Sequence, residues 1–373
     1  MPYLGESIPK LGFGLMRLPM LGGDVDIGQV KQMVDLFLAR GFTYFDTAWG
    51  YLDGKSELAA RAALVDRYPR ERFQLATKLP AWCGPKTARE AQDMFYTSLG
   101  RTGAGYFDFY LLHNLGDMLT RSFDEFGIWD FVKARKEEGL IKHYGFSFHD
   151  KADVLDALLT AHPDVEFVQL QINYADWESP GVESRKCYEV ARRHGKPVVI
   201  MEPIRGGMLA SLPESVEKVL RRDDPAQSAP SWALRFAASL EGVVTVLSGM
   251  STLAQMEENT AMMQGFLPLS ARERETVAEA GEALAKIPTV PCTDCRYCRK
   301  GCPQQIAIPG VFRAVNIFKT YGDRAAAKGK YGWETRDGGT AGKCVACGAC
   351  ERVCPQHIPI IEELRKAAAL LES

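Results

Sequence analysis

Eight of the ten cysteines in this chain lie in two short runs close to its C-terminal end. The second run begins 52 residues after the first, and both follow the pattern C-x2-C-x2-C-x3-C-P. The runs are Cys292, Cys295, Cys298 and Cys302, and then Cys344, Cys347, Cys350 and Cys354. Thiolate sulfur is a soft ligand that suits iron–sulfur clusters and zinc. The C-terminal part of the chain is therefore predicted to bind metal.

The spacing within each run favours one of these metals. In two-cluster bacterial ferredoxins the first three thiolates of a run hold one 4Fe-4S cluster, and the fourth reaches the other cluster. That rule predicts two clusters, one held by Cys292, Cys295, Cys298 and Cys354, and the other by Cys344, Cys347, Cys350 and Cys302. Zinc, which takes four ligands at a site, remains a second interpretation. Disulfides are less expected, because no feature of the sequence indicates export.

The remainder of the cysteine-rich tail predicts a small helical domain. Helices are expected at 310–321 and 360–371, and the connection 308–343 is longer than in compact two-cluster ferredoxins. We therefore expect a mainly α-helical, ferredoxin-like domain over residues 288–373. This segment contains 13 basic and 8 acidic residues. The basic surplus either offsets the negative charge of the thiolate clusters or forms a docking surface for an acidic electron carrier.

A second set of chemically capable residues lies in the first third of the chain. Asp46, Lys78 and His113 each end a predicted strand, and Tyr51 follows Asp46 by five residues. A phenol has an ordinary pKa of about 10 and is a poor proton donor at neutral pH. A lysine ammonium beside it lowers that pKa, and a carboxylate holds the ammonium in place. We therefore expect Tyr51 to act as an acid supported by Lys78 and Asp46, with His113 hydrogen-bonding the oxygen that receives the proton.

These residues require a scaffold of repeated strand–helix units, because short β-branched or aromatic runs alternate with longer stretches of helical period. Asp26, for example, is expected to cap a helix that runs to Arg40. A weak eighth strand is expected at 265–269. The seven stronger candidates are residues 43–46, 73–78, 107–113, 141–147, 167–171, 198–201 and 243–248.

Eight units of this kind predict an α/β fold, a TIM (β/α)8 barrel, whose catalytic residues lie at the C-terminal ends of the strands. A doubly wound open sheet is the competing architecture. Its G-x-G-x-x-G fingerprint between a strand and a helix is missing. The segment Gly12-Phe13-Gly14 lacks the third glycine at the required spacing, and we interpret it as an N-terminal turn.

Length and composition agree with a large domain followed by a small one. The chain has 373 residues, of which 46% are hydrophobic and 25% charged, and its net charge is −2. Such a balance gives no field that would favour nucleic acid or an anionic membrane. No run of 18 apolar residues or secretory leader occurs, so a cytoplasmic protein is expected. The predicted domains are a barrel over 1–287 and a cluster domain over 288–373.

The motifs around the four strand-end residues resemble those of the aldo-keto reductases over roughly residues 5–270. Asp46 and Tyr51 lie in a D-T-A-x-x-Y segment, and His113 closes an L-L-H segment, so the family tetrad of Asp, Tyr, Lys and His is matched in order. The resemblance implies reversible carbonyl reduction by hydride transfer from a nicotinamide cofactor. The tail is similar to the ferredoxin-type extension found on a subgroup of this family.

The resemblance also implies a set of cofactor contacts, with some departures from the family pattern. Phe148 and His149 replace the family asparagine, and Met201 replaces an aromatic residue that stacks on the nicotinamide. Gly249 and Gln255 replace basic residues that bind the 2′-phosphate, so preference for NADPH is expected to weaken unless Arg205 compensates. The implied contacts are Ser147, Gln169, Met201, Arg205, Gly206, Ser248, Gly249, Ser251, Gln255, Glu258 and Asn259.

The two parts together predict an oxidoreductase that acts on a carbonyl or hydroxyl substrate and is coupled to an electron-transfer module. Clusters carry single electrons, whereas a nicotinamide transfers two as hydride. A ferredoxin or flavoprotein partner, and a flavin in the barrel, are therefore alternatives to NAD(P)H alone. The other function considered is a redox sensor or electron relay in which the barrel is a scaffold. Four aromatic residues that follow strands are candidates for a substrate pocket or for packing, namely Trp49, Trp82, Tyr174 and Trp177.

Overall fold

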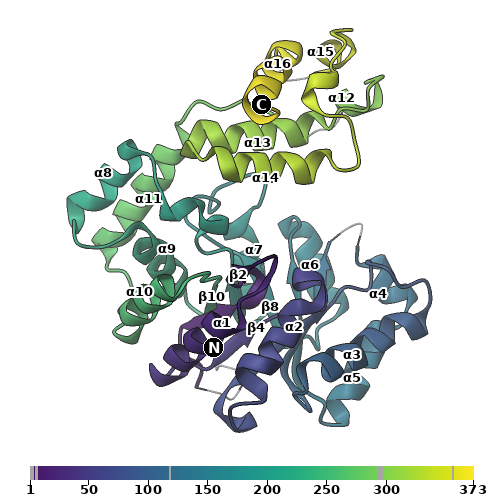
Figure 1. The fold of residues 1–373 in the computed structure, drawn as a ribbon, viewed down its shortest axis with the longest axis vertical. Coiled ribbons are helices and arrows are strands. Elements are labelled where there is room, and N and C mark those ends of the chain that lie inside the picture. Colours follow the sequence, from purple (N-terminus) through teal and green to yellow (C-terminus); the bar gives the residue numbers. More distant parts are fainter. Residues whose placement is uncertain (1–3, 5–6, 117–118, 293–296, 355–356) are drawn as a thin grey trace. The chain divides into compact units, whose positions relative to one another are not determined.

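The computed structural model describes residue 4 and residues 7–116, 119–292, 297–354 and 357–373 (Figure 1). The chain divides into two compact units. The first unit comprises Met1–Ala210 and Asp223–Ala278, and the second comprises Ser211–Arg222 and Glu279–Ser373. No helix in the described ranges is long and apolar enough to cross a membrane.

The first unit is built on a closed parallel barrel, to which eight strands of the described chain contribute. Their order around the barrel is β1-β10-β9-β8-β7-β6-β5-β4, so each strand lies beside its sequence neighbours. A separate hairpin, β2 (Met20–Leu21) with β3 (Asp24–Val25), is antiparallel. The barrel strands are β1 (Leu11–Gly14), β4 (Tyr44–Asp46), β5 (Gln74–Leu79), β6 (Phe107–Leu115), β7 (Ile141–Phe148), β8 (Phe167–Gln171), β9 (Val198–Met201) and β10 (Val243–Ser248).

The predicted barrel is confirmed, but the identity of its eighth strand was wrong. The segment interpreted as an N-terminal turn is β1, which pairs with β10 through Leu11 and with β4 through Gly12. Residues 265–269, the expected eighth strand, form a turn and an irregular segment. Glycine is unfavourable in a strand on propensity alone. Gly12 is needed there because a Cβ atom would lie 2.8 Å from Leu247 and 3.2 Å from Tyr44.

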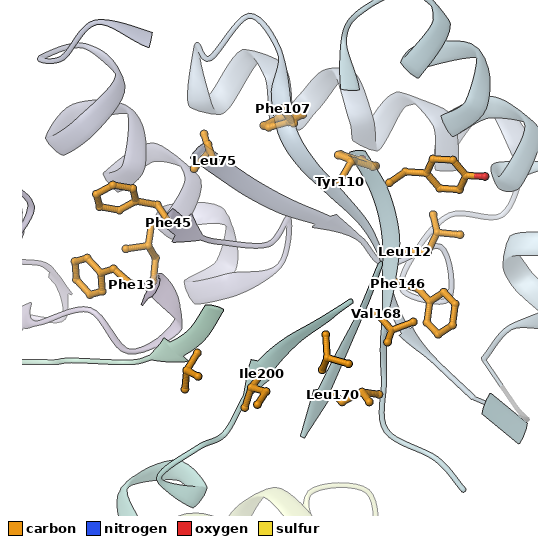
Figure 2. Close-up of a cluster of buried hydrophobic side chains, with 14 of the residues drawn as sticks. Phe13, Phe45, Leu75, Phe107, Tyr110, Leu112, Phe146, Val168, Leu170 and Ile200 are labelled. Carbon is orange, nitrogen blue, oxygen red and sulfur yellow. The ribbon is translucent and has the colours of Figure 1, made fainter. Parts of the chain in front are cut away.

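Alternation along the strands separates an inner core from an outer one, because successive side chains point to opposite faces of a sheet. Tyr44 and Phe167 belong to the cluster inside the barrel, whereas their neighbours Phe45 and Val168 belong to the layer between strands and helices. Figure 2 shows this outer layer, with Phe13 beside Phe45 and with Phe107 near Tyr110. The outer layer holds the helices against the barrel and leaves the strand ends for polar groups.

Helices follow the strands around the barrel. The Asp26 carboxylate accepts from the Gln29 amide and caps α1, as expected. Helix α2 is followed by one π turn at 61–65. The helices that lie wholly in the first unit are α1 (Ile27–Ala39), α2 (Lys55–Ala60), α3 (Ala88–Thr102), α4 (Arg121–Glu125), α5 (Ile128–Glu137), α6 (Ala152–Ala161), α7 (Ser184–Arg193), α9 (Ala229–Ala238) and α10 (Leu253–Gln264). Helix α8 (Glu214–Asp223) belongs to the second unit except for its last residue, and α11 (Ala271–Ala285) is divided between the two units.

The cysteine-rich part is helical, as predicted. Both helices expected there are present, as α13 (Ile308–Tyr321) and α16 (Ile360–Leu371). They pack around an apolar cluster that includes Val311, Phe312 and Leu364 together with several of the cysteines. The other helices are α12 (Tyr297–Lys300), α14 (Arg324–Thr335) and α15 (Ala349–Arg352).

Candidate functional site

The floor of the candidate site is a buried ion pair at the C-terminal ends of β4 and β5. The Lys78 ammonium donates to the Asp46 carboxylate and, at 2.8 Å, to the Thr47 carbonyl. The exposed fractions of Lys78 and Asp46 are only 1% and 3%. Lys78 and Asp46 lie close together because β4 and β5 are parallel neighbours in the barrel. The chain after β4 continues beside β5, and the Trp49 amide donates to the Lys78 carbonyl. Charges withdrawn from water in this way carry a desolvation penalty that their pairing has to offset.

Several contacts hold the segment that carries Tyr51 next to this ion pair. Tyr51 starts a short turn, Tyr51–Gly54, which residues 47–50 separate from β4. Arg101 of α3 donates to the Trp49 carbonyl at 2.9 Å and pairs with the buried Glu57 carboxylate at 3.3 Å. Glu57 in turn accepts from the Thr77 hydroxyl at 2.7 Å. These contacts fix the turn, and the Lys78 ammonium lies 4.8 Å from the centre of the Tyr51 ring.

His113 completes the arrangement from β6. Its ring lies edge-on to Tyr51, with 5.7 Å between ring centres. The β6–β7 pairing shifts register between Leu112 and Leu115, and such irregularities redirect a side chain. The Trp82 indole donates to the His113 carbonyl at 2.7 Å. Among the residues that the structure describes, His113 Nδ1 is buried with no hydrogen-bond partner.

Burial and Lys78 set the protonation states of Tyr51 and His113. Burial raises the pKa of Tyr51, and the Lys78 ammonium only partly opposes that rise. Lys78 thus acts on the Tyr51 pKa in the expected direction, but in the free protein burial of the ring outweighs it. Burial, Lys78 and His149 hold the pKa of His113 well below its usual value. At neutral pH Tyr51 thus retains its proton, and His113 is an uncharged imidazole.

The charge on Lys78 is maintained by its partners. Burial alone would lower the pKa of Lys78, but Asp46 and Tyr51 outweigh it and the pKa is raised. Burial raises the pKa of Asp46, whereas Lys78 and a hydrogen bond from Gln169 lower it. The site therefore places a fixed ammonium below a protonated phenol. This arrangement can stabilise a phenolate formed after the phenol gives up its proton.

Three of the predicted cofactor contacts lie around this floor. The Gln169 amide donates from Nε2 to Asp46 Oδ2 at 3.2 Å, and its Oε1 is buried without a partner within the described chain. The Ser147 hydroxyl accepts from the Asn114 amide at 2.8 Å, and Asn114 has a left-handed backbone with φ of 61°. Met201 at the end of β9 is partly buried. The structure thus brings these three residues to the same end of the barrel as Tyr51.

The predicted adenosine-side contacts meet at the start of α10. Ser248 accepts from the Asn259 amide at 3.2 Å, and the Ser251 amide donates to Gln255 Oε1 at 2.8 Å. The Ser251 hydroxyl donates to the Arg17 carbonyl at 2.7 Å. The N-terminus of a helix attracts anions through its free amides.

The other predicted cofactor contacts, Gly249, Glu258 and Gly206, lie in different surroundings. A Cβ atom placed on Gly249 would lie 3.7 Å from Arg17 Cβ, so Arg17 is a basic residue beside this loop. Glu258 is exposed on α10. Gly206 has a φ of 65°, a backbone conformation that favours glycine.

Arg205 is engaged elsewhere in the structure. Its guanidinium pairs at 3.1 Å with Asp176, which is buried and also accepts from the Gln171 and Asn173 amides at 2.9 and 2.8 Å. Removing Arg205 from this pair would leave a buried carboxylate with one charged partner fewer. Compensation for the missing phosphate contacts by Arg205 therefore competes with an existing ion pair.

Two polar residues near the site were not predicted as site residues. His149 follows β7 and lines a pocket together with Gln171, and the loss of water around its ring lowers its pKa. Glu202 follows β9, pairs with Arg17 at 3.4 Å and interacts with both His149 and Tyr51. Both residues directly follow strands, which is the signal that identified Asp46, Lys78 and His113. The same criterion applied to β7 and β9 would have found them.

The four strand-end aromatic residues do not form one pocket. Trp82 lies beside His113, with 6.4 Å between ring centres. Tyr174 and Trp177 pack on Phe236 at 6.3 and 5.4 Å. Trp49 lies under the Arg101 guanidinium at 5.0 Å. Packing therefore explains Tyr174 and Trp177. Trp49 and Trp82 each contact the predicted tetrad, Trp49 through its amide on the Lys78 carbonyl and Trp82 through its ring beside His113.

The second predicted cluster site is a pocket in the cysteine-rich unit. All four cysteines assigned to that cluster line it, namely Cys302, Cys344, Cys347 and Cys350. Ile306, Ile308 and Leu364 form an apolar wall, and the Ile306 amide donates to Cys302 Sγ at 3.5 Å. Four thiols around one pocket, with an amide directed at sulfur, are the donor set that a 4Fe-4S cluster requires.

The first predicted cluster site is described in part. Cys292, Cys298 and Cys354 all belong to the apolar cluster of this unit, and Cys298 is buried. Cys295 lies outside the described residues. None of the described cysteines forms a disulfide. Outside the motifs, Cys187 is buried, and burial raises the pKa of its thiol to about 12.

Comparison with known families and structures agrees with the two predicted parts of the chain. A model of the aldo/keto reductase family matches residues 10–282, and a model of the 4Fe-4S dicluster domain matches residues 291–358. The chain belongs to the aldo/keto reductase family. It carries a C-terminal 4Fe-4S dicluster domain of the ferredoxin type. The sequence matches none of the curated proteins with which it was compared.

Solved structures resemble the barrel part of the chain. The holo form of an aldo-keto reductase from Bacillus halodurans is 25% identical with a TM-score of 0.60, over 74% of this chain and 93% of that one. An aldo-keto reductase from Klebsiella pneumoniae, solved in complex with NADPH, is 21% identical with a TM-score of 0.57, over 73% and 90%. One from Brucella melitensis is 22% identical with a TM-score of 0.58, over 74% and 95%. These likenesses support the barrel fold.

Proposed function

We propose that this chain is an oxidoreductase in which a barrel over residues 1–287 reduces a carbonyl group, or oxidises the corresponding alcohol. A cluster domain over 288–373 exchanges electrons with it or with a partner. The observation that carries the proposal is the buried Lys78–Asp46 pair directly beneath Tyr51 and His113. A scaffold has no need of such a pair, because burying two charges is costly unless their interaction serves a purpose.

The proton chemistry follows from these four residues. Tyr51 gives its hydroxyl proton to the oxygen of the reduced carbonyl, and the resulting phenolate is stabilised by the Lys78 ammonium. Asp46 holds Lys78 in place, and the neutral His113 donates a hydrogen bond that orients the same oxygen. A bound NAD(P)H would supply the hydride that the carbonyl carbon receives. In the alcohol direction the same residues accept the proton.

NAD(P)H is supported by unsatisfied groups as well as by family membership. The buried Gln169 Oε1 lacks a partner within the described chain and can accept from a carboxamide. The N-terminus of α10, where the Thr252 hydroxyl already accepts from the Gln255 amide, and the adjacent Arg17 suit a phosphate. The residues implied by the resemblance therefore fit a nicotinamide dinucleotide. A flavin fed by a ferredoxin or flavoprotein is the competing donor.

Anaerobic turnover identifies the electron donor. The protein is assayed against a panel of aldehydes and ketones with NADH, with NADPH and with reduced ferredoxin. We expect reduction with a nicotinamide cofactor, and turnover only with ferredoxin would instead support the flavin or direct route. The absence of turnover with every donor, in protein with full iron content, would favour the sensor or relay function.

The second cluster site gives a prediction on metal content. Cys350→Ser is expected to reduce iron from about eight to about four atoms per chain, because four thiolates hold each cluster. Cys187→Ser, which changes a buried cysteine outside the motifs, serves as the matched control and should retain full iron. Iron and acid-labile sulfide are measured on anaerobically purified protein. Zinc in place of iron would contradict the cluster assignment.

A further inference from the structure

The four cysteines of the second cluster site differ in their access to solvent. Cys302 and Cys350 are buried, and Cys344 is partly buried, whereas Cys347 is exposed. The buried side of the pocket is closed by the apolar wall of Ile306, Ile308 and Leu364. Electron transfer becomes rapidly slower as the distance between redox centres grows. A partner protein would therefore reach this site most closely through the side on which Cys347 lies.

The surface around Cys347 combines apolar and basic residues. Val345 and Val353 are unusually exposed for valine, with 58% and 48% of their surfaces accessible. Lys343 and Arg352 are exposed beside them, and the Arg352 guanidinium approaches the Cys347 carbonyl at 3.5 Å. We refer to this surface as the Cys347 face, defined by Lys343, Val345, Ala346, Cys347, Arg352 and Val353.

The acidic groups near this face are hydrogen-bonded to neighbouring groups. Glu351 is the only acidic residue between 341 and 354, and its carboxylate accepts from the Ile361 amide at 2.9 Å. Glu372 accepts from the Gly342 amide at 2.8 Å and from the Tyr331 hydroxyl. Both carboxylates are thus bound to neutral donors, whereas Lys343 and Arg352 are exposed beside the apolar centre. A basic rim around an apolar patch is suited to an acidic protein.

We propose that the Cys347 face is the docking site for an acidic protein that carries one electron, of the ferredoxin or flavodoxin kind. The inference rests on the proposed function, because it requires a cluster at the site lined by Cys302, Cys344, Cys347 and Cys350. The carrier loses one electron and the cluster gains one, and no bond is formed or broken. Lys343 and Arg352 attract and orient the carrier, and Val345, Ala346 and Val353 supply the apolar contact.

Reduction kinetics of the full-length protein test this face. Reduced acidic ferredoxin is mixed anaerobically with the oxidised protein, and bleaching of the clusters is followed by stopped-flow absorbance. The double charge reversal Lys343→Glu with Arg352→Glu should reduce the second-order rate constant by about 10-fold or more at low ionic strength. The difference should shrink as salt is added, because exposed charges are screened. Binding of oxidised ferredoxin, measured by calorimetry, should weaken in parallel.

The matched control reverses two exposed arginines on the barrel unit, Arg89→Glu with Arg121→Glu. Arg89 lies on α3 and Arg121 on α4, and each pairs with an acid four residues on. The control changes net charge by the same amount, so it should retain the wild-type rate if docking is local. Val353→Asp adds a charge to the apolar centre and should also slow reduction. Wild-type rates in both face variants would overturn the proposal, as would an equal loss in the control.

A further comparison separates failure of the docking face from failure of the proposed function. Dithionite should bleach wild type and all variants equally, which shows that the clusters are intact. If dithionite bleaches wild type but acidic ferredoxin does not, the docking proposal is wrong and the cluster assignment stands. If the anaerobically purified protein contains no iron, the proposed function itself fails. Faster reduction by a basic carrier would likewise overturn the acidic partner.

Discussion

Tyr51→Phe is expected to reduce kcat/KM for the carbonyl substrate by about 10²- to 10⁴-fold, the usual contribution of a positioned general acid. The variant retains the aromatic ring that lies 5.7 Å from His113 and loses the hydroxyl proton. Because the pKa of Tyr51 is raised, the hydroxyl is protonated at neutral pH and its loss removes the proton donor. Single-turnover rates with the preferred donor measure the chemical step directly.

Tyr110→Phe is the matched control for this substitution. Tyr110 lies on β6, the strand that carries His113, and its side chain belongs to the layer between strands and helices. Its hydroxyl is buried with no hydrogen-bond partner in the described structure. Its removal should therefore leave both activity and stability close to wild type. Activity of Tyr51→Phe equal to that of Tyr110→Phe would contradict the role of Tyr51 as acid.

Lys78→Met is expected to destabilise the barrel by about 3–5 kcal/mol, because removing one partner leaves a buried, uncompensated charge. Asp46 would retain the hydrogen bond from Gln169 but lose its only salt-bridge partner in the described chain. The free energy of unfolding is measured by guanidinium chloride titration. Adding Asp46→Asn to Lys78→Met removes the charge and should recover part of the loss. Equal stability of wild type and Lys78→Met would show that the pair is not ionised.

The stability of Lys78→Met is expected to depend on pH with a definite sign. Burial raises the pKa of Asp46, and Lys78, which lowers it, is absent from the variant. A carboxyl group whose pKa is higher in the folded state than its unfolded value of about 3.9 stabilises the folded state at pH values below the unfolded pKa. This stability is lost as the pH rises through the folded-state pKa. The deficit of Lys78→Met relative to wild type should therefore grow from pH 4 toward neutrality, and Lys78→Met with Asp46→Asn should not show this growth.

Much of the fold could be predicted from local pattern. Apolar alternation and helical period located seven barrel strands and both large helices that flank the cysteine motifs. The strand Leu11–Gly14 was missed because its glycines resemble a turn, and the reason for Gly12 is the approach of Leu247 and Tyr44. Those two residues are remote in sequence. A pattern of residues that are close along the chain therefore carries no information on this contact.

The candidate site could also be predicted in part, from the residues that end the strands. Parallel strands of a barrel end at one face, so strand-end residues such as Asp46, Lys78 and His113 were expected to meet. The raised pKa of Tyr51 was not predicted, because it depends on how much protein surrounds the ring. The pairing of Arg205 with Asp176 was also not predicted.

The sequence by itself determined the ligand types and spacing of the cluster domain. Three thiolates of each cluster lie within seven consecutive residues, so short-range chain geometry is sufficient to group them. It also determined which residues end strands, through alternation along the chain. Only the tertiary structure decided that Cys347 is exposed while Cys302 and Cys350 are buried, and that burial outweighs Lys78 at Tyr51. Exposure and pKa depend on atoms from distant segments, which the fold alone brings together.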